Sequence, residues 1–150
     1  MIIRDILNMK GGTIFSMAPD GRLSDAVGVM VKNDIGSLVV MDGGRMAGML
    51  TFREVLKALH AHGGNLAELT IREVMIADPV SGNPEDSLDH LREVMTRQHV
   101  RYLPVLEGGR LLGVISFHDV AKSVIKQTSF ENRLLKRYIK NRPEAEDASQ

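Results

Sequence analysis

The strongest constraint on the fold of this chain is an internal repeat. When the 150-residue sequence is compared with itself at an offset of 65, residues 19–57 align with residues 84–122 without a gap. Thirteen of the 39 aligned positions are identical, where ordinary composition would give about two or three. Upstream, residues 3–6 match residues 71–74 at an offset of 68, so the first copy holds three additional residues, which we place at 10–13. The chain is a tandem duplication of one structural unit.

Each copy predicts the same series of elements. A short apolar run, Thr13–Ser16 in the first copy, predicts a brief strand, and apolar residues then recur at helical spacing. Two further strands follow, at 38–41 and 46–50 in the first copy, separated by an acidic-Gly-Gly turn that is typical of a β-hairpin. A second helix is expected to begin near Thr51 and, in the second copy, near Ser116. The predicted β-α-β-β-α unit is too small to stand securely alone, so the two copies should pack together.

The repeat also predicts the division of the chain. We expect the first repeat at residues 1–62, a linker at 63–70, the second repeat at 71–127, and a C-terminal segment at 128–150. That segment predicts a separate helix over Phe130–Lys140, followed by a frayed acidic tail at Asn141–Gln150. The helix carries an apolar stripe that is too wide for a solvated tail and favours a homodimer. The stripe consists of Phe130, Leu134, Leu135, Tyr138 and Ile139.

Composition excludes several classes of protein. Nineteen basic residues balance 19 acidic ones, which argues against a nucleic-acid binder. No apolar run approaches the ~18–20 residues of a membrane span, and the N-terminal sequence does not resemble a secretory signal. With no cysteine there is no disulfide, cysteine nucleophile or thiolate metal site. A cytoplasmic protein without membrane or nucleic-acid partners is the default expectation.

The order of these pieces resembles a known family. In the second copy, Leu103-Pro104-Val105 precedes the acidic-Gly-Gly turn, and Gly113 is followed by Ser116-x-x-Asp119; the first copy repeats this order. Over about residues 1–127 the chain resembles a tandem pair of CBS domains, a Bateman module, and is similar to short stand-alone bacterial CBS-pair proteins. The resemblance implies an α/β fold in which two β-α-β-β-α units are related by a pseudo-two-fold axis. It also implies two clefts that bind adenosine-containing ligands: AMP, ADP, ATP, NAD(H) or S-adenosylmethionine.

The Ser-x-x-Asp motif of the second copy is the leading candidate for ligand binding. The resemblance implies that Asp119 holds the ribose hydroxyls and that Ser116 lies toward the phosphates. A carboxylate suits the first role because it accepts two hydrogen bonds, and a helix N-terminus favours an anion. The same spacing is also a helix cap, so a structural role stays open.

The first copy departs from this pattern. It has Thr51 and Glu54, where the resemblance leads us to expect Asp or Asn at the fourth position. Glu is one methylene longer, and Thr-x-x-Glu is the better capping box. The first cleft is therefore expected to be empty or differently occupied, with the ligand held mainly by the motif of the second copy.

The segment before the middle strand of the second copy adds further candidates. Strand alternation predicts His99, Arg101 and Leu103 on one face. Arg101 suits a phosphate and Tyr102 could flank an adenine, although Arg101 could equally be an exposed charge at a strand edge. Pro104 lacks a backbone donor and predicts an open strand edge. The resemblance places Phe15, Val80 and His118 at the ligand as well.

No catalytic machinery is recognisable in the sequence. There is no P-loop or dinucleotide-binding fingerprint, and His60-x-His62 has the wrong spacing for two ligands on one helix face. No hydroxyl residue has an identifiable His and acid partner. We therefore expect a regulatory module, not an enzyme, that senses an adenosine nucleotide and signals to an unidentified protein. The alternative is a structural or protein-interaction module that binds no ligand.

Overall fold

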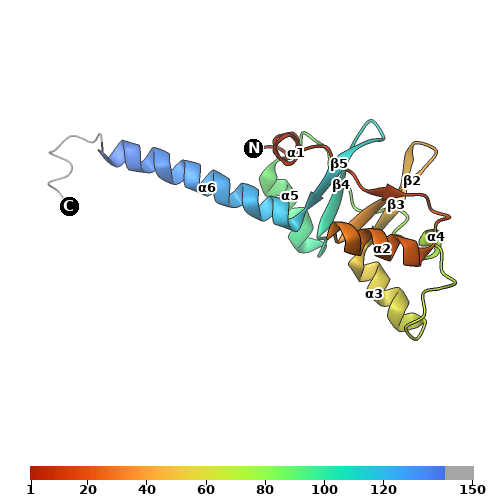
Figure 1. Ribbon diagram of the computed structural model, residues 1–150. Coiled ribbons are helices and arrows are strands. Elements are labelled where there is room, and N and C mark those ends of the chain that lie inside the picture. Colours follow the sequence, from red (N-terminus) through yellow and green to blue (C-terminus); the bar gives the residue numbers. More distant parts are fainter. Residues whose placement is uncertain (141–150) are drawn as a thin grey trace.

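Two copies of one α/β unit form the protein, and its C-terminal helix extends away from them (Figure 1). The computed structural model describes residues 1–140, so the tail expected at 141–150 lies outside the described residues. The elements of the first repeat are α1 (Ile3–Lys10), β1 (Ser16–Met17), α2 (Leu23–Asn33), β2 (Ser37–Asp42), β3 (Arg45–Thr51) and α3 (Phe52–Ala61). Those of the second are α4 (Ile71–Val74), α5 (Leu88–Arg97), β4 (Tyr102–Glu107), β5 (Arg110–Ser116) and α6 (Phe117–Lys140).

Both predicted hairpins are confirmed. β2 pairs antiparallel with β3, and β4 pairs antiparallel with β5 in the equivalent register. The turn glycines have positive φ angles, 57° and 82° at Gly43 and Gly44 and 58° and 79° at Gly108 and Gly109. Two consecutive positive φ angles give the turn whose twist matches the flanking strands, and glycine adopts them without steric cost.

The first strand of each repeat is shorter than predicted. β1 covers Ser16–Met17 instead of Thr13–Ser16, and its counterpart in the second repeat is a single bridge from Gly82 to Val105. In the first repeat the Val39 amide donates to the Phe15 carbonyl at 3.0 Å. The equivalent residue in the second repeat is Pro104, which has no amide hydrogen and cannot make this bond.

The expectation of an open edge at Pro104 was wrong. Gly82 covers this edge of β4: its amide donates to the Pro104 carbonyl at 2.9 Å, and its carbonyl accepts from the Leu106 amide at 3.0 Å. The predicted alternation of faces before Pro104 was wrong as well. β4 begins only at Tyr102, and His99 has a left-handed φ of 53°, so it precedes the strand.

The two repeats exchange their N-terminal helices. Ile3 and Ile6 of α1 belong to the hydrophobic core of the second repeat, where they meet buried residues such as Leu91 and Ile115. Conversely, Ile71 of α4 is buried in the core of the first repeat with residues such as Leu23. Figure 1 shows this arrangement, with α1 beside β5 and α4 beside α2. The two copies therefore complete each other's cores, as their small size required.

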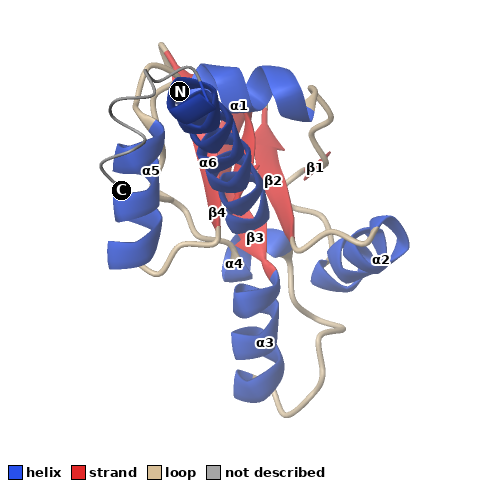
Figure 2. Cartoon of the chain, turned by 90° about the vertical axis from the view of Figure 1, so that its left-hand side faces the viewer, coloured by secondary structure: helices blue, strands red, loops and turns tan. Residues whose placement is uncertain are grey.

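The helix predicted at Phe130–Lys140 is not a separate element. α6 runs without interruption from Phe117 to Lys140, a length of 24 residues. Neither proline nor glycine occurs in this range, so nothing in the sequence breaks the helix near Gln127. Viewed from its end, α6 crosses in front of the sheets and leads away from them (Figure 2).

Candidate functional site: two clefts between the repeats

Two cavities flank the contact between the repeats, and each contains the start of one long helix. The Ser116 cleft, of about 560 Å³, lies at the start of α6, and the Thr51 cleft, of about 740 Å³, lies at the start of α3. Both volumes fall within the range of about 300–1,000 Å³ that small-molecule sites occupy. Polar residues that line the Ser116 cleft include Lys10, Thr13, Asp34, Ser37, Arg101, Tyr102, Ser116 and His118. The Thr51 cleft is lined by residues that include Thr51, Glu54, Lys57, His60, Ile76, His99, Arg101 and Tyr102.

Each cleft combines parts of both repeats. The Ser116 cleft joins the helix start of the second repeat to Gly36 and Ser37, where β2 of the first repeat begins. The Thr51 cleft joins the helix start of the first repeat to Arg101 and Tyr102 of the second. Gly36 and Ser37 are the first-repeat equivalents of Arg101 and Tyr102, yet they line the Ser116 cleft and not the Thr51 cleft. Alignment of the repeats identifies equivalent residues, but it does not reveal that the two copies contribute to each other's clefts.

The Ser116-x-x-Asp119 motif caps the N-terminus of α6 through two reciprocal hydrogen bonds. The Ser116 amide donates to Asp119 Oδ2 at 2.8 Å, and the Asp119 amide donates to Ser116 Oγ at 3.1 Å. This reciprocal pair is the capping box that the sequence left open as an alternative. It fixes both side chains at the helix start, where the positive end of the helix dipole lies.

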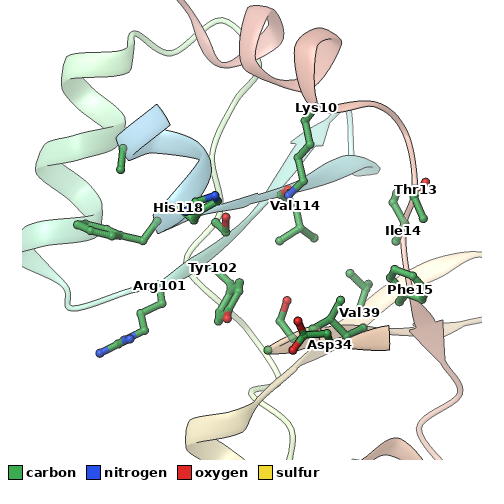
Figure 3. A pocket seen from close by; sticks show the side chains of 16 residues that line it. Lys10, Thr13, Ile14, Phe15, Asp34, Val39, Arg101, Tyr102, Val114 and His118 are labelled. Atoms are coloured by element: carbon green, nitrogen blue, oxygen red, sulfur yellow. The ribbon is translucent and has the colours of Figure 1, made fainter. Parts of the chain in front are cut away.

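Lys10, the last residue of α1, reaches the same motif from the first repeat. Its Nζ donates to Asp119 Oδ2 at 2.6 Å and to the Val114 carbonyl at 2.6 Å. Figure 3 shows the Lys10 side chain directed from α1 into the cleft toward Val114. The ion pair is partly protected from water, since the side chains of Lys10 and Asp119 are 33% and 16% exposed.

This environment acts on the pKa of Asp119 in two opposing ways. Burial raises the pKa of Asp119, whereas hydrogen bonds from Lys10 and from the Ser116 amide lower it, and the net effect places it below its ordinary value. The carboxylate is therefore held in its charged form. Asp119 is not among the residues that line the Ser116 cleft; it lies behind Lys10, beside a smaller basic cavity lined by Lys122 and Lys126.

Arg101 and Tyr102 lie between the two clefts and line both. The Arg101 guanidinium points away from Lys10 (Figure 3), and its carbon lies 5.6 Å from the centre of the Phe52 ring. The Tyr102 ring meets Phe52 edge-on, with 6.4 Å between the ring centres. The Tyr102 hydroxyl lies against Gly36, where a Cβ would overlap it. The cation and the ring that the sequence assigned to the second motif thus contact α3 of the first repeat.

The Thr51 cleft has a different helix cap and a different wall. Glu54 bonds to both the amide and the hydroxyl of Thr51, with 3.1 Å to the amide nitrogen, so the predicted capping box is present. Ile76 closes the sheet side of this cleft by pairing its backbone with Met49, at 2.8 and 3.0 Å. In the Ser116 cleft the residue equivalent to Met49 is Val114, whose carbonyl accepts from Lys10 instead.

Of the remaining residues predicted to bind a ligand, two line the Ser116 cleft and two line neither cleft. Phe15 and His118 line the Ser116 cleft, from opposite sides of it (Figure 3). Val80 lines neither cleft and packs against the core of the second repeat, and Pro104 is buried within β4. Sequence reasoning missed Lys10 and Asp34. The three additional residues near 10–13 were the signal that could have identified Lys10, because they mark where the two copies differ.

Comparison with known families identifies this architecture. The family model for the CBS domain matches twice, at residues 3–61 and 71–126. The chain belongs to the CBS-domain family. The predicted tandem pair, with its α/β fold and two repeated units, is therefore confirmed.

Related CBS-pair proteins share both sequence and structure with this chain. The CBS domain-containing protein YhcV of Bacillus subtilis is 27% identical over 127 residues, which cover 85% of this chain and 88% of that protein. The crystal structure of the CBS-domain containing protein ATU1752 from Agrobacterium tumefaciens has a TM-score of 0.78 and 32% identity, covering 82% and 98% of the two chains. The CBS domain pair of protein MJ0100, solved with 5′-methylthioadenosine and S-adenosyl-L-methionine, has a TM-score of 0.73 and 21% identity, covering 85% and 98%.

CBS pairs are generally regulatory modules without catalytic activity of their own. Across residues 1–140, no helix is both long and apolar enough to cross a membrane. Within the same residues, no group of three or more His, Asp or Glu side chains is arranged to hold a metal ion.

Proposed function

We propose that this CBS pair is a cytoplasmic regulatory module that binds an adenosine nucleotide in the Ser116 cleft and signals to a protein partner. The observation that carries the proposal is the convergence of cationic and aromatic side chains on the start of α6. Lys10 supplies positive charge for a phosphate group, His118 supplies ring nitrogens for hydrogen bonds, and Phe15 and Tyr102 supply rings for a base.

The electrostatics of the Ser116 cleft suit an anionic ligand. The start of a long helix adds partial positive charge, and Ser116 presents a hydroxyl there. Asp119 is held ionised 2.6 Å from Lys10, so a carboxylate acceptor for ribose hydroxyls becomes available if Lys10 moves. Bound 5′-methylthioadenosine and S-adenosyl-L-methionine in the structural relative MJ0100 support an adenosine-containing ligand for this fold.

The identity of the ligand can be tested in two steps. First, mass spectrometry of small molecules released from freshly purified protein would show any nucleotide that co-purifies. Second, thermal unfolding should be measured with AMP, ADP, ATP, NAD and S-adenosylmethionine, because a ligand at 100 times its Kd adds about 2.7 kcal/mol of stability. A stabilising nucleotide whose effect is lost in Ser116→Ala, but kept in Ser24→Ala on α2, supports the proposal. No stabilisation by any of them overturns it.

A second candidate function rests on α6. Beyond Gln127 its apolar residues are exposed, including Phe130 (59%), Leu135 (57%) and Tyr138 (68%). We propose that this stripe mediates homodimer formation, and that a module without ligand could act through it alone. Light scattering at tens of micromolar should show a dimer. A monomer contradicts the proposal, and a dimer that survives truncation after Gln127 places the contact on other helices.

A further inference from the structure

Lys10 is supplied by a difference between the two repeats. α1 has eight residues, whereas its counterpart α4 has four, and the additional turn ends at Lys10. Because α1 is the exchanged helix, this turn carries an ammonium group of the first repeat to the helix cap of the second. Gly11 and Gly12 follow directly, and the space beside both glycines is open.

The position of Lys10 blocks the acceptor that a ribose would need. Its Nζ bonds to Asp119 Oδ2, and Lys10 lines both the Ser116 cleft and the smaller cavity beside Asp119, whereas Asp119 lines only the smaller cavity. A ligand that bonds to Asp119 Oδ2 from the Ser116 cleft must therefore displace an ammonium group from a partly buried ion pair. A displaced Lys10 is stabilised by another anion, because Lys122 and Lys126 line the same small cavity as Lys10 and Asp119 and repel its ammonium group.

A phosphate group can satisfy both requirements. If the ribose hydroxyls donate to Asp119, the 5′-phosphate of the same molecule can pair with the Lys10 ammonium group. The Lys10–Asp119 ion pair is then replaced by a Lys10–phosphate ion pair. Adenosine without a phosphate displaces Lys10 and offers it no anion. We infer that Lys10 is the specificity-determining residue of the Ser116 cleft, selecting phosphorylated over unphosphorylated adenosine by competing for Asp119. This inference rests on the proposed function and names the ligand class of that same site.

The decisive measurement is the ratio of AMP to adenosine affinity, determined by calorimetric titration of the full chain. In Lys10→Met, adenosine should bind more tightly, because its competitor is gone, and AMP should bind more weakly, because its phosphate has lost a cation. Loss of a charge-assisted hydrogen bond corresponds to about ten- to a hundredfold, so the ratio should fall at least about tenfold. Lys10→Arg, which keeps the charge, should retain the ratio within about threefold.

Lys57→Met is the matched control. Lys57 lines the Thr51 cleft, and its removal changes the net charge by the same amount. It should leave the ratio at the Asp119-dependent site unchanged. If Lys10→Met leaves the ratio of AMP to adenosine affinity unchanged, the inference is wrong while the proposed function stands. If neither AMP nor adenosine binds the unaltered chain, the inference is wrong, and the proposed function is overturned only if ADP, ATP, NAD and S-adenosylmethionine fail to bind as well.

Discussion

The two clefts of this protein are built from equivalent residues, yet their helix caps have different partners. Beside the Ser116 cleft, the carboxylate of Asp119 bonds to its own cap and to Lys10 from the other repeat. In the Thr51 cleft, Glu54 bonds to Thr51 of the same cap, and the adjoining sheet edge pairs with the backbone of Ile76. One additional helical turn in α1 accounts for the lysine. The comparison teaches that a small insertion in an exchanged helix can change the chemistry of a site in the other repeat.

The largest expected difference between the clefts is in nucleotide affinity. Asp119→Ala should weaken AMP binding by about ten- to a hundredfold, because a charge-assisted hydrogen bond to the ligand is lost. Glu54→Ala should weaken it less, because Glu54 lines the Thr51 cleft and not the Ser116 cleft, where we propose that the nucleotide binds. Calorimetric titration of both variants measures this. Abolished binding in Glu54→Ala, with intact binding in Asp119→Ala, would assign the working cleft to Thr51.

The sheet sides of the clefts should differ in their tolerance of a methyl group. A Cβ on Gly48 would overlap the backbone carbonyl of Ile76, whereas a Cβ on the equivalent Gly113 would lie 2.8 Å from the end of the Leu7 side chain. Gly48→Ala should therefore destabilise the fold by about 1–3 kcal/mol, the usual cost of overpacking. Gly113→Ala should cost less than about 1 kcal/mol, because Leu7 can change rotamer. Urea unfolding gives both values; equal costs would contradict the difference between the two walls.

Acid should remove a contribution that Asp119 makes to stability. Because the folded-state pKa of Asp119 is lowered, its stabilising effect is present above its unfolded pKa of about 4 and is lost as the pH falls through the folded value. At pH 6 the unaltered chain should exceed Asp119→Asn in unfolding free energy by about 1 kcal/mol, the usual size of a helix cap. Below pH 3 this gap should narrow. A gap that is constant with pH would show that the Asp119 carboxylate is not held ionised by folding.

The smallest expected effect is on stability, from replacing Arg101, which lines both clefts. Arg101→Ala should lower stability by about 0.5–1 kcal/mol, because it removes the cation from the Phe52 ring at an exposed site. In a Phe52→Leu background the same substitution should have little effect, since the contact is already lost. A double-mutant cycle of unfolding free energies measures this coupling. Additive effects would show that Arg101 is independent of α3.

Local sequence patterns predicted much of this fold. The repeat, both glycine hairpins and the Thr51–Glu54 cap follow from contacts between residues close in sequence, which propensity and spacing report directly. The positions at which helices and strands begin and end were harder to predict. The shortened first strand of the second repeat depends on a missing donor at Pro104, and the continuity of α6 depends on the absence of any helix breaker.

The candidate site was predicted only in part, because its decisive contact is remote in sequence. Lys10 and Asp119 are 109 positions apart, and nothing in either copy alone indicates that they meet. Their proximity follows from the exchange of α1 and α4, which the alignment of the repeats cannot show. The sequence pointed to the cap residues and Phe15, but it could not show that Arg101 faces the first repeat as well as the second.

The helix exchange also bears on the origin and synthesis of the chain. A single ancestral repeat would have left its own core uncovered unless a second molecule lent it a helix, so the ancestor is best pictured as a domain-swapped pair of identical subunits. Gene fusion would then have joined two subunits into one polypeptide. On the ribosome, α1 is made before residues 88–120, which form the core that it covers. It must therefore wait for most of the second repeat before it can pack.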